Sequence, residues 1–177
     1  MMNFTLFPST RSYLMLDVSD LAPDFTLPRD GGDTVSLADL KGSGVILFFY
    51  PRDDTPGCTK ESIGFSATLQ SFADAGVQVF GISKDNVASH DKFVAKHDLT
   101  TPLLSDETGA TCEDYGVWKE KSMYGKTFMG IERSTFYIGP DGTIQAVWRN
   151  VKVPGHVQDV LAMTRRLRAR DAKAAQD

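Results

Sequence analysis

The chain is poor in cysteine, with two residues of this type, Cys58 and Cys112, among 177. Small secreted domains that depend on disulfides carry many more, so a disulfide scaffold is excluded. A chain of this length buries about 70% of the surface that its unfolded form exposes, and it therefore needs no such crosslink to hold a core. The two cysteines must therefore have a role other than crosslinking the chain.

Excess positive charge and long hydrophobic runs are also absent. The 19 Lys and Arg residues against 23 Asp and Glu give a net charge of −4, which does not favour binding to a phosphate backbone. No run reaches the 18 or more apolar residues of a membrane helix. Residues 1–16 are apolar but lack the basic start and the cleavage site of a secretory signal. We expect a cytoplasmic protein that binds neither nucleic acid nor membrane.

The length predicts a single domain, because one domain typically has 100 to 200 residues. We place an N-terminal extension at residues 1–16, the domain at 17–170 and a polar C-terminal tail at 171–177, with fraying from Arg168 onward. Met15 stands just before the domain, so a mis-assigned start codon is a hypothesis for the extension. The intact mass of the native protein tests it.

Strand and helix signals alternate along the chain. Short runs around the turn at residues 29–33 predict an N-terminal β-hairpin. The apolar run 45–50, a helix ending near Gly76 and the run 77–83 predict a strand-helix-strand crossover. Further signals predict helices near 86–97, near 107–115 and after Gly155, and a hairpin formed by 134–138 and 143–148. The fold class is α/β, with a mixed central sheet flanked by helices.

The helix that follows the first central strand has a clear start. Thr55 is expected as its N-cap and Pro56 as its first residue. An apolar stripe of Ile63, Leu69 and Phe72, with Phe65 on its flank, is expected to face the core.

The segment 51–58 joins the carboxyl end of that strand to this helix, where open α/β sheets place ligands and catalytic groups. Cys58 falls in the first helical turn, where free N–H groups and the helix dipole favour a thiolate. The dipole contributes only about 0.3 to 1 kcal/mol, and up to about 2 in favourable sites, so a cation is needed too. Arg52 and Arg133 are the candidates. A buried structural thiol is the alternative, but the polar neighbours of Cys58 favour function.

Dithiol oxidoreductases carry C-x-x-C at such a junction, whereas this chain has Thr55-Pro56-Gly57-Cys58. The pattern leaves one nucleophilic sulfur beside a hydroxyl. A hydroperoxide suits such a site, because thiolate attack on its terminal oxygen gives a sulfenic acid. Hydrogen bonds from Thr55 and an arginine would stabilise the leaving oxygen.

Pro51, Thr55 and Cys58 match the P-x-x-x-T-x-x-C signature of peroxiredoxins. The sequence resembles the bacterioferritin comigratory protein, or peroxiredoxin Q, branch in further blocks, in the same order: Ala22–Phe25, Phe49–Pro51, Leu103–Asp106, Tyr115–Trp118, Tyr124–Lys126, Gly130–Phe136 and Val153–His156. The resemblance implies a thioredoxin-like fold and thiol-dependent reduction of hydrogen peroxide or organic hydroperoxides, with no cofactor and no metal.

The resemblance also assigns roles. Cys58 is the peroxidatic thiol, Thr55 hydrogen-bonds the peroxide, Pro51 shields the site from water and Arg133 is the activating cation. Glu61 either tethers an arginine or is an ordinary solvated carboxylate.

The chain departs from the family at the resolving cysteine. Many members carry this residue five positions after the peroxidatic one, where Ile63 stands, or in the next crossover helix, and residues 86–97 contain none. We therefore expect a one-Cys enzyme that is reduced by an outside thiol such as thioredoxin, glutaredoxin or glutathione. Cys112 is expected to be a half-buried helix residue. The alternatives are Cys112 as an atypical resolving cysteine, a peroxide-sensing regulator, or a catalytically inactive interaction protein.

Other candidate features receive simpler interpretations. His90 and His97 share a helix face, but no third ligand is evident nearby, so we expect polar partners rather than a metal. Aromatic and Met side chains between residues 118 and 129 either line the active-site cleft or pack on the sheet. The arginines between 165 and 170 are expected to face solvent. Without an identifiable apolar surface patch, we expect a monomer or weak homodimer.

Overall fold

The computed structural model describes residues 15–176, so most of the expected N-terminal extension, and with it the start-codon hypothesis, lies outside the described residues. Among the described residues, no helix combines the length and the apolar character that crossing a lipid bilayer requires.

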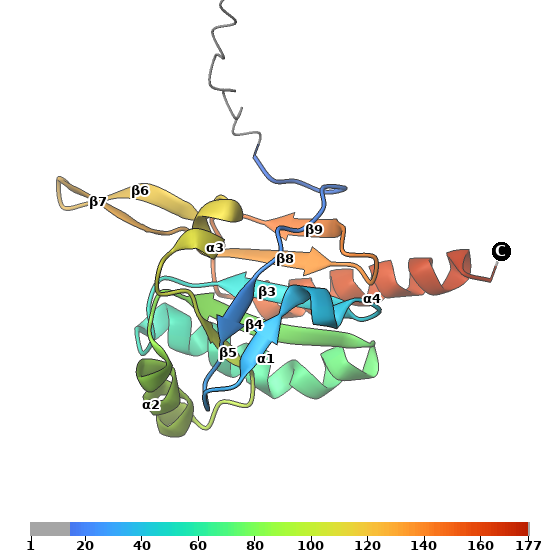
Figure 1. Ribbon diagram of the computed structural model, residues 1–177, viewed down its shortest axis with the longest axis horizontal. Coiled ribbons are helices and arrows are strands. Elements are labelled where there is room, and N and C mark those ends of the chain that lie inside the picture. Colours follow the sequence, from blue (N-terminus) through green and yellow to red (C-terminus); the bar gives the residue numbers. More distant parts are fainter. Residues whose placement is uncertain (1–14, 177) are drawn as a thin grey trace, which may run out of the picture.

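A five-stranded mixed sheet forms the centre of the molecule, in the order β5-β4-β3-β8-β9 (Figure 1). The bounds of its strands are β3 (Gly44–Phe49), β4 (Val77–Ser83), β5 (Leu103–Ser105), β8 (Ser134–Ile138) and β9 (Ile144–Trp148). β3 pairs in parallel with β4, and β4 with β5, whereas β8 is antiparallel to both β3 and β9. The expected mixed sheet and both expected hairpins are confirmed.

Two hydrophobic cores lie on opposite faces of this sheet. The side chains of Ile46 and Phe48 in β3 pack with α1 (Pro56–Asp74), α2 (Val87–His97) and α4 (His156–Ala174). The alternating side chains of Val45, Leu47 and Phe49 pack on the other face. This face is covered by α3 (Ala110–Asp114), the hairpin β1 (Thr26–Pro28) and β2 (Thr34–Ser36), and the 3-10 helix η1 (Leu37–Leu40). Because both faces are covered, β3 is apolar throughout.

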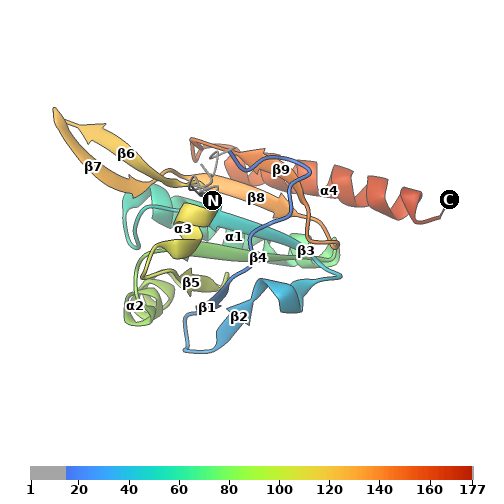
Figure 2. The ribbon, with the colours of Figure 1, turned by 45° about the horizontal axis from the view of Figure 1, so that its top comes forward.

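A hairpin of β6 (Trp118–Met123) and β7 (Lys126–Ile131) was not expected from the sequence. It projects from the end of the sheet where α1 begins (Figure 2). Tyr124 and Gly125 both have positive φ, as a two-residue hairpin turn requires. Tyr124 is 98% exposed, and Phe128 and Met129 are exposed as well. Packing on the sheet, one of the two expectations, is therefore wrong for these three side chains, whereas Trp118 does pack against the core.

Three helix details also differ from expectation. In α1 the buried side runs through Cys58, Ser62, Phe65 and Phe72, while Ile63 is 44% exposed. The predicted stripe is confirmed for Phe65, Leu69 and Phe72 and wrong for Ile63, because the first turns of the buried side carry polar residues that a hydrophobic pattern ignores. The other two differences concern where α4 ends and where α3 begins. α4 continues to Ala174 instead of fraying from Arg168, whose guanidinium bonds the Ala75 carbonyl, and α3 begins only at Ala110.

Candidate active site

Cys58 lies in the first turn of α1, directly after the carboxyl end of β3, and is 1% exposed. Thr55 is the N-cap and Pro56 the first helical residue, as expected. The Thr55 hydroxyl, however, donates to the carbonyl of Arg52 at 2.9 Å and makes no side-chain bond to the helix N–H groups. The N–H groups of the first turn therefore stay available at the helix end that holds Cys58.

Arg133, between β7 and β8, supplies the cation at this thiol. Its Nη2 lies 3.4 Å from Cys58 Sγ and its Nη1 lies 2.8 Å from Glu61 Oε1, so one guanidinium contacts both side chains. Gly57 permits this approach, because a Cβ at that position would lie 3.1 Å from Nη2. Arg52, the other candidate, is exposed, and among the described residues no hydrogen bond or ion pair joins it to Cys58.

Glu61 holds the guanidinium from the buried side. It is fully buried, and Oε2 has no hydrogen-bond partner among the described residues. Burial raises the pKa of Glu61 to about 7, against the opposing attraction of Arg133. Burial alone would lower the pKa of Arg133, but Glu61 and Cys58 outweigh it and raise that pKa, so the guanidinium stays charged. The interpretation of Glu61 as a tether is confirmed, and that of a solvated carboxylate is wrong.

An open cavity of about 380 Å³ lies beside this group. Pro51 lines it together with Arg133, Asn150 and residues of β6 from Lys119 to Ser122. The hairpin therefore borders the active site, but through charged and polar side chains rather than through Tyr124, Phe128 or Met129. The outer side of Pro51 is exposed.

Cys112 lies on the opposite side of the sheet from Cys58. The two thiols belong to the two different cores, and both are free. Cys112 is fully buried rather than half-buried, and its backbone N–H donates to Asp106 at 2.8 Å. Burial, together with the Asp106 carboxylate, raises the pKa of the Cys112 thiol well above its usual range. Cys112 is therefore a poor nucleophile.

The structure adds a buried polar group that the sequence analysis missed. His90 contacts Asp53, which lies between Pro51 and Thr55, and Asp85 is close to both. His97 bonds Asp54 at 2.9 Å. The expectation of polar partners for the two histidines is thus confirmed, although two carboxylates do lie near His90. The one available signal was the Asp53-Asp54 pair in the segment before Cys58.

Comparisons with known proteins show the family of the chain. The model of the AhpC/TSA family matches residues 18–147. Peroxiredoxin Bcp of Xanthomonas campestris is 47% identical over 139 residues, covering 78% of this chain and 87% of the relative. Peroxiredoxin Bcp of Bacillus subtilis is 43% identical over 148 residues, covering 84% of this chain and 94% of the relative.

Solved structures show the same similarity. The X. campestris bacterioferritin comigratory protein, described for its alkyl peroxide reduction activity, has a TM-score of 0.81 at 42% identity, and the match covers 86% of this chain and 99% of that one. BcpB of Mycobacterium tuberculosis has a TM-score of 0.75 at 35% identity, with 85% and 97% covered. The expected thioredoxin-like fold is confirmed.

Proposed function

This chain belongs to the AhpC/TSA family and is a peroxiredoxin, a thiol-dependent peroxidase, and on that premise we propose that Cys58 reduces hydrogen peroxide and organic hydroperoxides through a sulfenic acid. The observation that carries the proposal is the contact of Arg133 with both Cys58 and Glu61. A charged guanidinium beside the sulfur favours the thiolate, which is the attacking form.

The first step forms one bond and breaks one. The Cys58 thiolate attacks the terminal oxygen of the hydroperoxide, the O–O bond breaks, and the alkoxide leaves and takes a proton to become an alcohol, or water when the substrate is hydrogen peroxide. Arg133 donates to the oxygens on which charge develops. The Thr55 hydroxyl gives its one proton to the Arg52 carbonyl, so the expected hydrogen bond from Thr55 to the leaving oxygen does not fit this geometry. Its free lone pairs instead accept the hydrogen bond of the peroxide. Pro51, at the edge of the cavity, limits the access of water.

The second step uses a thiol from outside the chain. A disulfide requires Cα atoms within about 7 Å of each other, whereas Cys58 and Cys112 pack on opposite faces of the central sheet. Cys112 also stays protonated and buried. An external thiolate therefore attacks the sulfenic acid, releasing water, and a second thiol then frees Cys58 as a thiolate. Thioredoxin, glutaredoxin and glutathione are the candidate donors, in a reducing cytoplasm.

Mass spectrometry after one equivalent of peroxide tests the one-Cys assignment. We expect a sulfenic acid on Cys58 that a dimedone probe traps equally well in the wild type and in Cys112→Ser. A Cys58 to Cys112 disulfide in the peptide map, with loss of trapping in the wild type alone, would show that Cys112 resolves the enzyme.

A coupled assay with each of the three donors tests turnover. Continuous peroxide consumption with at least one donor supports an enzyme, and Cys58→Ser is expected to abolish it. A single oxidation event with every donor would instead favour a peroxide-sensing regulator.

A further inference from the structure

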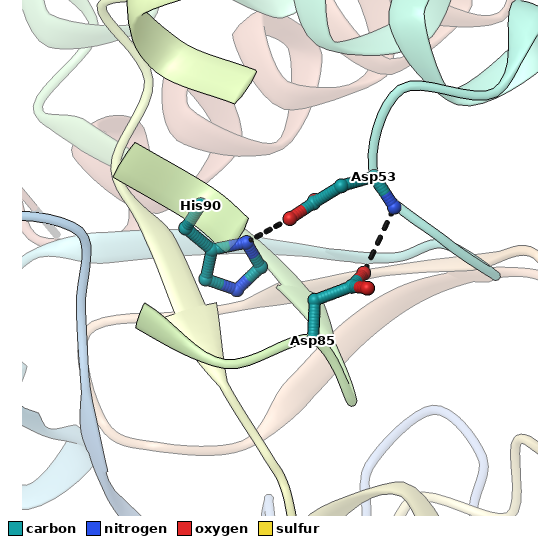
Figure 3. A group of neighbouring side chains, drawn as sticks. All are labelled: Asp53, Asp85 and His90. Carbon is teal, nitrogen blue, oxygen red and sulfur yellow. Dashed lines mark hydrogen bonds and ion pairs between the residues drawn. The ribbon is translucent and has the colours of Figure 1, made fainter. Parts of the chain in front are cut away.

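The side chain of Asp53 is buried among three donors that come from two elements. Tyr50, just after β3, donates to Oδ1 at 2.6 Å, and Ser89 of α2 donates to Oδ2 at 2.8 Å. His90 of α2 places Nδ1 2.7 Å from Oδ2 (Figure 3). The Asp53 side chain is therefore fixed by contacts at both of its oxygen atoms.

The other side of the His90 ring fixes its charge. Nε2 lies 3.0 Å from the carbonyl oxygen of Leu104, which can only accept a hydrogen bond. Both ring nitrogens thus face acceptors, and neutral imidazole carries only one N–H. His90 is fully buried, so neither contact is replaced by bulk water. Both bonds form only when the ring is a doubly protonated imidazolium.

These contacts act on residues 51–55, the segment that carries Pro51 and Thr55 and leads into the helix of Cys58; we call it the 51–55 loop. Its Asp53 backbone N–H donates to Asp85, the third residue of the group in Figure 3. Its Asp54 has φ of 57°, in the left-handed region, and bonds Lys96 and His97 of α2. Such a conformation persists when neighbouring contacts determine it. The loop is thus attached to α2 at two consecutive residues.

We propose that His90, as a buried imidazolium bonded to Asp53, is a positioning residue that holds the 51–55 loop in the geometry that places Thr55 and Cys58. The inference rests on the peroxidase function proposed above. The same three residues, Asp53, Asp85 and His90, also have the composition of a cation site. In the structure their oxygen and nitrogen atoms are instead engaged with one another and with Ser83, Ser89 and Leu104.

The proposal predicts a pH dependence. The charged or titratable groups that face His90 are Asp53 in the loop, Asp85 after β4 and, through Asp53, the Tyr50 hydroxyl. Burial lowers the pKa of His90, but the bond and charge of Asp53 outweigh it and raise the pKa above 6.5. The ion pair with Asp53 therefore contributes fully below about pH 6.5. As the pH rises through the folded-state pKa the ring keeps a single N–H, so this ion pair and one of the two hydrogen bonds are lost.

Nitrogen-15 NMR of the full chain tests the protonation state without any need for activity. The chain has three histidines, so His97→Gln and His156→Gln are enough to assign the imidazole signals. We expect two protonated ring nitrogens on His90 at pH 6, with loss of one proton only at a pH above the ordinary imidazole pKa of 6.5. A single protonated nitrogen at pH 6, or loss of the Nδ1 proton on addition of Zn²⁺ at micromolar concentration, would overturn the proposal.

Two variants test the positioning role. In His90→Asn the amide nitrogen can replace Nδ1 as donor to Asp53 but does not titrate, whereas His90→Phe removes both donors. For oxidation of Cys58 by peroxide, we expect the Phe variant to be about tenfold to a hundredfold slower. We expect the Asn variant to react close to the wild-type rate at pH 7 and to overtake the wild type as the pH rises above the His90 pKa.

Alkylation of Cys58 by iodoacetamide provides a readout that does not depend on peroxidase activity. If the wild type fails to react with peroxide, the proposed function fails, while alkylation rates and NMR still report on the loop. A folded Phe variant with wild-type rates, or a rate ratio of the Asn variant to the wild type that does not change with pH, would overturn the proposal. If the Phe variant does not fold, the Asn variant and the NMR experiment decide.

Discussion

Glu61 offers a sharp test of how the site holds its arginine. It is a fully buried carboxylate with one charged partner, Arg133 at 2.8 Å. Its Oε2 has no hydrogen-bond partner in the described part of the chain. When such a buried group ionises, its charge is shielded from water and is compensated by a single ion pair. The desolvation cost of the charge then exceeds the attraction of Arg133. The raised pKa of Glu61, about 7 against an ordinary 4.5, expresses the difference.

The cost can be worked out from that pKa. One pKa unit corresponds to about 1.36 kcal/mol, so ionised Glu61 lowers the free energy of unfolding by about 3 kcal/mol, after the attraction of Arg133 is included. Between pH 4.5 and about 7 the folded protein keeps a proton that the unfolded chain has lost. The contribution of Glu61 to stability therefore falls as the pH rises through this window and is constant on either side.

The substitution Glu61→Gln keeps the shape and the oxygen that accepts from Arg133 but removes the charge. Relative to the wild type, we expect the variant to gain about 3 kcal/mol in free energy of unfolding between pH 4.5 and pH 8. Urea unfolding, followed by tryptophan fluorescence at both pH values under reducing conditions, measures this gain. Taking the difference between variant and wild type cancels the other titrating groups.

Glu120→Gln is the matched control, because Glu120 is exposed in β6. We expect its effect to stay within about 0.5 kcal/mol at both pH values. The reasoning is refuted if the difference between Glu61→Gln and the wild type does not change with pH. It is refuted equally if the variant loses stability relative to the wild type as the pH rises, since the pair with Arg133 would then outweigh burial.

Three further predictions concern Arg133, the core of α1 and a buried histidine. In Arg133→Lys, the lysine has no planar group that could contact Glu61 and Cys58 together. We therefore expect oxidation of Cys58, followed by stopped flow, to slow by about a hundredfold. The rate should stay unchanged in the control Arg165→Lys, at an exposed position. Phe65→Ala removes a ring stacked 4.5 Å from Phe48 and should cost about 3 to 5 kcal/mol in urea unfolding, against about 0.5 kcal/mol for Ile63→Ala on the exposed side of the same helix. Burial lowers the pKa of His156 to about 4, so its contribution to stability is full above pH 6.5 and falls as the pH drops toward 4; His156→Gln should flatten this loss in thermal melts.

The fold and the position of Cys58 were predictable because they depend on local signals. A buried apolar strand, an N-cap threonine and a helix-starting proline lie within fourteen consecutive residues, 45–58, and the structure keeps them in that order. The partner Arg133 lies 75 positions away from Cys58, and the residues alone left it open against Arg52. Only the family resemblance favoured Arg133, because nothing local encodes the pairing of β3 with β8 that brings it close.

The remaining errors arise where polar residues occupy unusual environments. Buried Glu61 and Ser62 disguise the core-facing side of α1, so the hydrophobic pattern moved to Ile63. β6 and β7 form a hairpin that is largely exposed, and their sequences show no regular alternation of apolar and polar residues. A burial-based pattern cannot detect a strand that has no buried face. The turn at Tyr124 and Gly125 was the remaining local signal.

The proposed one-Cys mechanism and the contacts of α2 with the 51–55 loop bear on each other. A resolving thiol forms a disulfide with the buried Cys58 only when the two Cα atoms come within about 7 Å, which for a thiol in α2 depends on how far that helix can move. Contacts that lock α2 to the 51–55 loop, such as those of His90 with Asp53 and of His97 with Asp54, would oppose that movement. With the reducing thiol supplied from outside, α2 need not move, and the loop can stay attached to it throughout the cycle. Hydrogen exchange of α2 before and after peroxide addition distinguishes the cases: protection that persists fits an external thiol, whereas loss of protection on oxidation would contradict a fixed α2.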